Sequence, residues 1–173
     1  MDEERMHVLQ SIRTALETDV EPRSRLESVC TLLVDEFPAV HWAGFYGWDP
    51  ELPDELVLGP YAGETVEQIR VRMGTGAVGR AALERDLFTG VDPDNPHEDV
   101  ELTLPQGDHE DVPGAVIRHP DMRSEMAVPV ERDGELLGVL VVDSRLPAVF
   151  RDDDRTFLKN VSRLISEHIA ALS

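Results

Sequence analysis

The chain has 173 residues, of which 41% are apolar, and this is enough for a folded core within one domain. Asp and Glu number 35 against 16 Lys and Arg, which gives a formal charge of -19, and Lys159 is the only lysine. An acidic, lysine-poor surface is typical of a halophile, because concentrated salt screens the repulsion. The same charge argues against nucleic acid and anionic membranes as partners, since the chain has no basic stripe to neutralise phosphates.

We expect no targeting signal at the N-terminus and no membrane span. The first ten residues, MDEERMHVLQ, are charged and acidic, unlike a signal peptide. No apolar run approaches the ~20 residues of a membrane span. The lone cysteine, Cys30, cannot form an internal disulfide and says little about the compartment. We therefore expect a cytoplasmic protein.

Two helices are predicted before the first strand. Residues 3–18 have helical spacing of the apolar side chains Met6, Leu9, Ile12 and Leu16. Glu21-Pro22 ends this helix, and a second follows over residues 24–37. Its apolar stripe is formed by Leu26, Val29, Cys30, Leu33, Val34 and Phe37. Cys30 lies inside this stripe, which favours a small core residue over a reactive thiol.

Three strands and a short helix are predicted next. HWAGFYGWD (41–49) and residues 56–61 indicate two strands joined by a turn, and residues 68–73 alternate between apolar and polar. The glycine-rich residues 74–82 begin a short helix that ends near Arg85. Their spacing is not that of a phosphate loop. A glycine turn here is more often structural, although its free N–H groups can bind an anion.

Residues 91–123 are predicted to form a long acidic loop, with five of the twelve prolines. A loop of this length inside a compact domain is usually functional or disordered, and here it could act as a lid. It contains two similar segments, His97-Glu98-Asp99-Val100 and His109-Glu110-Asp111-Val112. Such groups can bind a divalent metal, but nothing fixes them at helical spacing, so we expect neither a metal site nor a cofactor.

The stretch SEMAVPVERDGELLGVLVVDS (124–144) is the clearest structural signal. Asp133-Gly134 predicts a hairpin turn between an alternating strand and a near-continuous apolar strand. Glu125 opens the first strand and Asp143 closes the second, so the hairpin brings the two carboxylates side by side. Two interpretations stay open at this point: each acid ends a strand in solvent, or the pair holds a small polar ligand.

A last helix is predicted from the acidic run at 152–154 to about residue 172. Its apolar stripe is formed by Phe157, Val161, Leu164, Ile165, Ile169 and Leu172. The order of elements predicts an α+β domain. The N- and C-terminal helices would cover one face of an antiparallel sheet, with ligand-binding loops on the other face.

Five motifs, in this order and spacing, resemble the stand-alone GAF domains that reduce free methionine-(R)-sulfoxide. They are Trp42-Ala43-Gly44-Phe45-Tyr46, Leu56-Val57-Leu58-Gly59-Pro60-Tyr61, Gly74-Thr75-Gly76-Ala77-Val78-Gly79, Ser124-Glu125 and Gly138-Val139-Leu140-Val141-Val142-Asp143-Ser144. The resemblance implies one GAF domain over 1–173, with an N-terminal helix over 1–22 and the GAF core over 24–170. It further implies a sheet of about six strands, a ligand pocket on the loop side and a homodimer through the terminal helices.

The sequence departs from this family at its cysteines. The family's motif Gly-x-Gly-Val-Cys-Gly has Val78 at the cysteine position here. The family's catalytic cysteine precedes the Ser-Glu pair, and Arg118 occupies that position, followed by His119. Sulfoxide reduction by this route needs one thiolate to attack sulfur and a second thiol to resolve the oxidised cysteine. We therefore name no catalytic residue and expect the reductase activity to be absent or very weak.

The resemblance also implies which residues bind a ligand. In the family, acids at the positions of Glu125 and Asp143 hold the amino group, and aromatic residues such as Trp42 and Tyr46 wall the thioether side. Arg118 and His119 would add positive charge at the pocket mouth, which suits an amino-acid-like zwitterion or a small anion. Arg118 has an equally good alternative as a partner of surface carboxylates.

These observations leave four possible functions for the chain. The first is a non-catalytic small-molecule sensor or binder, which we favour. The second is a free methionine-(R)-sulfoxide reductase that uses Cys30 or external thiols. The third is another enzyme, with His119 as acid or base and Arg118 as an anion clamp, although no nucleophile accompanies them. The fourth is a structural or interaction role.

Overall fold

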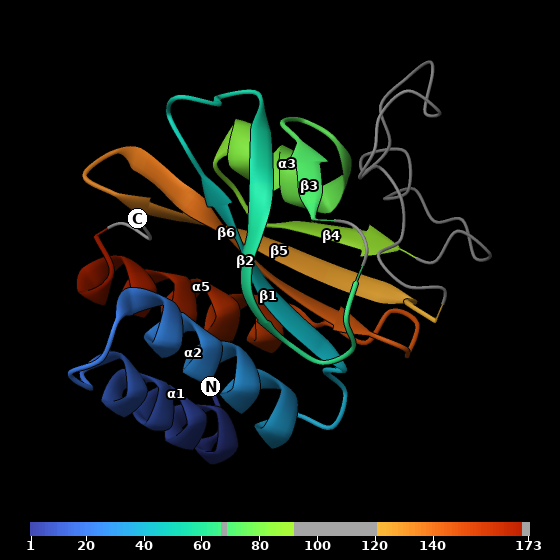
Figure 1. Cartoon of the computed structure of the whole chain (residues 1–173). Helices are drawn as coiled ribbons and strands as arrows, with labels where there is room; N and C mark the ends of the chain where they lie inside the picture. The colour runs from blue at the N-terminus through green and yellow to red at the C-terminus, as the bar shows by residue number, and fades with distance from the viewer. Residues whose placement is uncertain (67–68, 92–120, 171–173) are drawn as a thin grey trace.

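The centre of the fold is a six-stranded antiparallel sheet (Figure 1). The structure, a computed structural model, describes residues 1–66, 69–91 and 121–170. Within these residues the strands are β1 (Trp42–Trp48), β2 (Glu55–Ala62), β3 (Arg70–Arg72), β4 (Phe88–Val91), β5 (Ser124–Arg132) and β6 (Glu135–Ser144). Their order across the sheet is β3-β2-β1-β6-β5-β4. The predicted α+β class and six-stranded sheet are confirmed.

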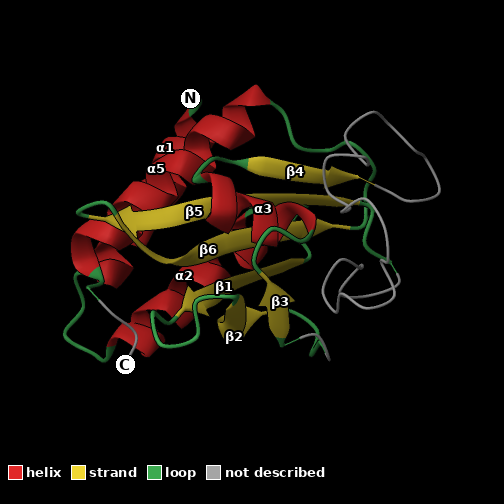
Figure 2. Ribbon diagram, turned by 90° about the horizontal axis from the view of Figure 1, so that it is seen from above, coloured by secondary structure: helices red, strands yellow, loops and turns green. Residues whose placement is uncertain are grey.

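Helices lie on both faces of this sheet. They are α1 (Glu3–Leu16), α2 (Pro22–Glu36), α3 (Gly76–Glu84) and α5 (Asp152–His168). Figures 1 and 2 show α2 and α5 against one face and α3 against the other. The predicted placement of the terminal helices on one face is confirmed with one refinement: α1 packs mainly on α2 and α5 and forms an outer layer.

Local chemistry explains where the helices begin. The Asp2 carboxylate accepts a hydrogen bond from the Arg5 backbone N–H at 2.9 Å and caps α1. Pro22 occupies the first turn of α2, where its missing N–H has no helical partner to lose. At the start of α5 the Asp154 carboxylate accepts from the Arg151 backbone N–H at 2.9 Å. The acids of the first turn also suit the helix dipole.

The apolar stripe of α1 differs from the prediction. Met6 was expected to face the core, but its exposed fraction is 58%, whereas Val8 is buried. Val8, Ile12 and Leu16 are spaced i, i+4 and i+8, so they share one face of the helix. This face packs into the groove between α2 and α5 and turns Met6 toward solvent.

The hairpin of β5 and β6 matches the prediction closely. Asp133 and Gly134 both have positive φ, 54° and 80°, as the tight hairpin turn requires. The strands pair from Ser124 opposite Ser144 to Arg132 opposite Glu135, with one irregularity between Val130 and Glu131. The central residues of β6 are buried on both faces, as its continuous apolar sequence predicts.

Several predicted features need correction or lie outside the described residues. The edge strand β4 has no counterpart among the predicted elements, and β3 has only three residues. The segments at His97 and His109, together with Arg118 and His119, lie outside the described residues, as does most of the predicted loop. In the described ranges no three His, Cys, Asp or Glu side chains are grouped to hold a metal. None of the helices described is long and apolar enough to cross a membrane.

The alternation of side chains along the strands divides the interior into two cores. One lies between the sheet and helices α2 and α5, and its strand residues include Phe45, Met126 and Leu140. The other lies between the sheet and α3, and it includes Trp42 and Val141. We call these the helix-side core and the α3-side core. Successive residues of one strand contribute to opposite cores.

Cys30 belongs to the helix-side core and is fully buried on α2. Its thiol lies 3.7 Å from the Pro60 carbonyl oxygen. Burial, with a smaller contribution from the charge of Glu27, raises the pKa of the Cys30 thiol to about 12. The prediction that Cys30 is a core residue is confirmed.

This raised pKa makes stability depend on alkaline pH. Between the ordinary thiol pKa of 9.0 and about 12, the unfolded chain releases the proton and the folded chain keeps it. The free energy of unfolding should therefore fall with rising pH in this window, by about 1.4 kcal/mol per pH unit from this group. Urea titrations of wild type and Cys30→Ala across the window isolate the contribution of the thiol. Parallel pH slopes for the two proteins would contradict it.

Candidate functional site

Four residues form a row across the sheet at one end of the hairpin. Trp42 of β1 pairs with Asp143 of β6, Asp143 pairs with Glu125 of β5, and Glu125 pairs with Gly90 of β4. We call these four residues the acid row. Directly opposed residues of antiparallel strands have Cα atoms about 4.5–5.5 Å apart, so the two carboxylates are immediate neighbours.

The acid row lies on the α3 side of the sheet. The next row on this face, two residues along each strand, contains Gly44, Val141 and Ala127. Val141 and Ala127 belong to the α3-side core, and side chains two residues apart share a face. Glu125 and Asp143 therefore point away from α2 and α5. This is the face on which the sequence predicted the ligand.

Both carboxylates are buried: the exposed fraction is 0% for Asp143 and 7% for Glu125. The interpretation in which each acid merely ends its strand in solvent is therefore wrong. The Glu125 side chain lies close against Gly90, because a Cβ at Gly90 would lie 3.3 Å from the Glu125 Cβ and 3.4 Å from its Oε1. Buried carboxylates are stabilised by polar or cationic groups, and two of them side by side make the acid row a region where positive charge is favourable.

The indole of Trp42 lies flat along β1 and is held on three sides. A Cβ at Gly44 would lie only 2.3 Å from the Trp42 Cη2, so the ring occupies the space that Gly44 leaves free. It stacks on Tyr61 with ring centroids 5.9 Å apart and an interplanar angle of 19°. Its Nε1–H donates to the Glu64 carbonyl oxygen at 3.1 Å. The aromatic end of the acid row is thus fixed in position.

Arg145 joins the Glu64 segment to the end of β6. Its guanidinium donates to the Glu64 carboxylate at 3.0 Å and lies 3.9 Å from the Asp121 carboxylate. Its backbone N–H donates to the His41 Nδ1 at 3.0 Å. These contacts connect the residues just before β1 and just after β2 and β6, and so hold the surroundings of the acid row together.

Two buried serines close the open end of the hairpin on the opposite face. Ser124 and Ser144 are paired across β5 and β6. The Ser144 hydroxyl accepts from the Leu146 N–H at 3.0 Å, and the Ser124 hydroxyl accepts from the Val149 N–H at 3.3 Å. The chain after β6 is therefore held against the hairpin, which limits movement of Glu125 and Asp143 next to these serines.

The other predicted site residues have different outcomes. Tyr46 is fully buried in the α3-side core, two rows from the acid row on the same face. The structure therefore brings Trp42, Tyr46, Glu125 and Asp143 onto one face of three adjacent strands. Val78, at the position of a family cysteine, is buried in α3 against this core. Arg118 and His119 are outside the described residues.

Sequence reasoning missed the small and structural residues of the site. Gly44 interrupts an aromatic strand, and a glycine inside a strand signals a close approach that could have been read from the sequence. Gly90 and Tyr61 carry no such local signal, because their positions depend on pairing with distant strands. The ion pair between Arg145 and Glu64 joins residues that are 81 positions apart in the sequence, and no local pattern predicts it.

Comparisons with known proteins show to which family the chain belongs. The GAF domain model matches residues 21–169. Protein YtsP of Bacillus subtilis is 26% identical over 163 residues, 94% of this chain and 89% of YtsP. The free methionine-R-sulfoxide reductase of Escherichia coli is 26% identical over 145 residues, 84% of this chain and 76% of that protein.

A solved structure is also similar over nearly the whole chain. It is the X-ray structure of free methionine-R-sulfoxide reductase from Neisseria meningitidis in complex with its substrate. The TM-score is 0.80 at 26% sequence identity, with 99% of this chain and 93% of that chain covered. The family model spans well over half of the sequence and the fold agrees, so the chain belongs to the GAF domain family.

Proposed function

We propose that this GAF domain binds a small amino-acid-like zwitterion at the acid row and does not reduce sulfoxides. The observation that carries the proposal is the adjacent pair of buried carboxylates, Glu125 and Asp143, on the α3 side of the sheet. An ammonium group between them would form charge-assisted hydrogen bonds with both. The indole of Trp42, in the same row, would pack against the apolar part of the ligand.

The position of the only thiol supports a role without redox chemistry. Cys30 lies in the helix-side core, on the opposite face of the sheet from Glu125 and Asp143. Its pKa, raised to about 12, leaves almost no thiolate at neutral pH. No second cysteine exists in the chain to resolve an oxidised one. The acid row can thus bind a ligand, but the chain lacks an accessible thiolate to attack a sulfoxide.

The second candidate function is a free methionine-(R)-sulfoxide reductase. It is favoured by the reductases of E. coli and N. meningitidis, to which the chain is similar along most of its length. In this case an external thiol would have to supply the electrons. The ligand class is the same for both candidates, because methionine sulfoxide carries an ammonium and a carboxylate.

An assay of free L-methionine (R)-sulfoxide in the presence of dithiothreitol separates the two candidates. Methionine is measured by chromatography at low salt and in about 2 M KCl, against a blank without protein. We expect no methionine above the blank, since no thiolate reaches the acid row. Methionine formation above the blank would favour the reductase, and a Cys30→Ser variant would then show whether Cys30 or only the external thiol takes part.

The proposal also includes the environment of the protein, which is the cytoplasm of a halophile. A formal charge of -19 with one lysine suits the concentrated salt of a halophile's cytoplasm, where a Debye length of about 3 Å at 1 M screens the repulsion.

As a sensor, the domain would transmit ligand binding by rearrangement of a homodimer through its terminal helices, or by docking to another protein. Light scattering with and without L-methionine tests for a ligand-dependent change in oligomeric state.

A further inference from the structure

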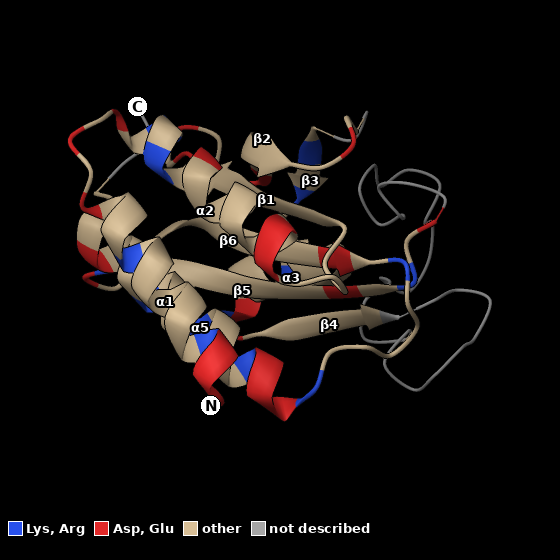
Figure 3. Ribbon diagram, turned by 90° about the horizontal axis from the view of Figure 1, so that it is seen from below, with Lys and Arg blue, Asp and Glu red and all other residues tan. Residues whose placement is uncertain are grey.

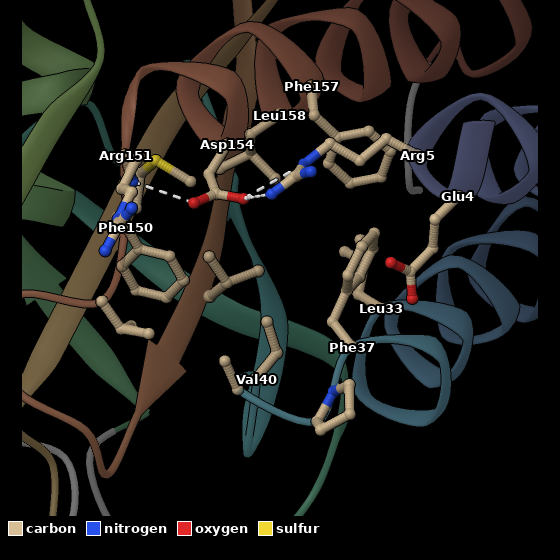
Figure 4. Close-up of a pocket in the computed structure, with 15 residues that line it drawn as sticks. Glu4, Arg5, Leu33, Phe37, Val40, Phe150, Arg151, Asp154, Phe157 and Leu158 are labelled. Atoms are coloured by element: carbon tan, nitrogen blue, oxygen red, sulfur yellow. Dashed lines mark hydrogen bonds and ion pairs between the residues drawn. The ribbon is translucent and has the colours of Figure 1, made fainter. Parts of the chain in front are cut away.

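A cavity of about 430 Å³ lies on the helix side of the sheet, opposite the acid row (Figure 4). Its floor is formed by Met126 and Val142 of the hairpin, and its walls by Phe37, which directly follows α2, and Phe157 of α5. Ligand sites in proteins commonly measure about 300–1,000 Å³ and have mostly apolar walls with a few polar groups. The size and lining of this cavity therefore suit a small molecule.

Arg5 and Asp154, two charged residues at the cavity, already form an ion pair with each other. The Arg5 Nη2 lies 2.6 Å and its Nε 3.2 Å from the Asp154 Oδ1, and its Nη1 contacts the Asp2 carboxylate. The other oxygen of Asp154 accepts from the Arg151 backbone N–H. Arg5 and Asp154 thus form a neutral, hydrogen-bonded rim, and neither is available as the main partner of a charged ligand.

The Glu4 carboxylate has no such partner in the described part of the chain. Figure 4 shows it directed from α1 toward the cavity, next to Phe37. The Phe37 and Phe157 rings meet edge to face with centroids 5.0 Å apart, and ring faces attract cations. Figure 3 shows acidic residues gathered where α1 and α5 begin, which are Asp2, Glu3, Glu4, Asp152, Asp153 and Asp154. The local field therefore favours positive charge.

We propose that this cavity is a second ligand site, for a small apolar ammonium compound. The apolar body lies between the hairpin and the helices, and the ammonium group lies at Glu4. The site does not depend on the function proposed for the acid row, because the sheet separates the two. It lies at the junction of α1, α2 and α5, so an occupant would bridge the outer helix and the hairpin.

The test uses three eight-carbon probes that differ only in the head group: octylammonium, octanol and octanoate. The protein carries methyl-labelled methionine, and NMR follows the Met126 methyl at the cavity floor and the Met73 methyl near the α3-side core. We expect Met126 to shift and Met73 to stay unchanged. Affinity should decrease in the order octylammonium, octanol, octanoate.

Three variants complete the test in the full chain. Glu4→Gln should weaken octylammonium about threefold to fivefold, the range of an exposed charge pair, and leave octanol unchanged. Glu3→Gln, which removes a neighbouring acid that does not line the cavity, should leave both unchanged. Ala39→Trp, at a half-buried lining position between α2 and β1, should weaken all three probes more than tenfold.

Three results would overturn the proposal. Tighter binding of octanoate than of octylammonium would show that the head group of the ligand binds to the arginines at the cavity and not to Glu4. A shift of Met73 without Met126 would place the probes on the other face. A dimer that Ala39→Trp dissociates, together with no binding of octylammonium, would make the cavity part of an interface between copies of the chain. The Met126 signal decides the matter even where a variant folds poorly, because it needs only the wild-type protein.

Discussion

Replacing Trp42 with alanine should lower the free energy of unfolding by about 3–5 kcal/mol. The exposed fraction of Trp42 is 1%, its ring stacks on Tyr61, and its Nε1–H donates to the Glu64 carbonyl oxygen. The variant removes a large buried side chain from the α3-side core and also leaves the Glu64 carbonyl without this donor. Urea denaturation in matched salt measures the loss.

The chain offers a matched control on the same strand. Trp48 lies at the other end of β1, is half-buried, and donates to the Pro53 carbonyl oxygen at 3.3 Å in an exposed position. Trp48→Ala should cost much less than Trp42→Ala. Trp42→Phe keeps an aromatic ring but loses the Nε1 donor, so it should cost about 1–2 kcal/mol. Equal losses for Trp42→Ala and Trp48→Ala would contradict the packing described for the site.

Neutralising the carboxylates of the acid row should remove stabilisation by the ligand. At 100 times its dissociation constant, a ligand adds about 2.7 kcal/mol to the free energy of unfolding. Glu125→Gln and Asp143→Asn each replace one charge-assisted bond to the ammonium by a weaker one, so each should weaken binding at least about tenfold. Thermal melting with L-methionine and its sulfoxide epimers measures the shift.

Glu131→Gln and Glu135→Gln are the controls for this experiment. They remove one carboxylate from the far end of β5 and of β6, close to the hairpin turn. Both variants should retain the full shift in melting temperature. A shift that all four variants lose equally would point to the overall charge of the protein rather than to the acid row.

The sequence predicted the site residues on the hairpin because their positions follow from local rules. Asp133-Gly134 fixes the turn, and the alternation of β5 fixes which residues share a face. A regular hairpin with this turn would place Glu125 opposite Val142. The irregularity between Val130 and Glu131 shifts the register by one residue, so that Glu125 lies opposite Asp143. The sequence thus predicted that the two acids are neighbours, but it did not predict this shift. The apolar stripe of α2 likewise predicted the burial of Cys30, which is fully enclosed.

Features that depend on distant contacts were not predictable in this way. The four-residue strand β4 pairs with β5, from which it is separated in sequence by most of the predicted loop. The exposure of Met6 results from the docking of α1 between two other helices. The cavity on the helix side is formed by residues from both ends of the chain and from the hairpin. Each of these features arises from packing, which the periodicity of one segment does not determine.

The most direct test of the central claim is a calorimetric titration of the wild-type protein with L-methionine sulfoxide and with its N-acetyl derivative. Acetylation removes the positive charge from the nitrogen and leaves the rest of the molecule intact. If Glu125 and Asp143 hold an ammonium group, the free amino acid should bind and the acetylated compound should not. Equal binding of the two compounds, or no heat with either, would contradict the account of the acid row.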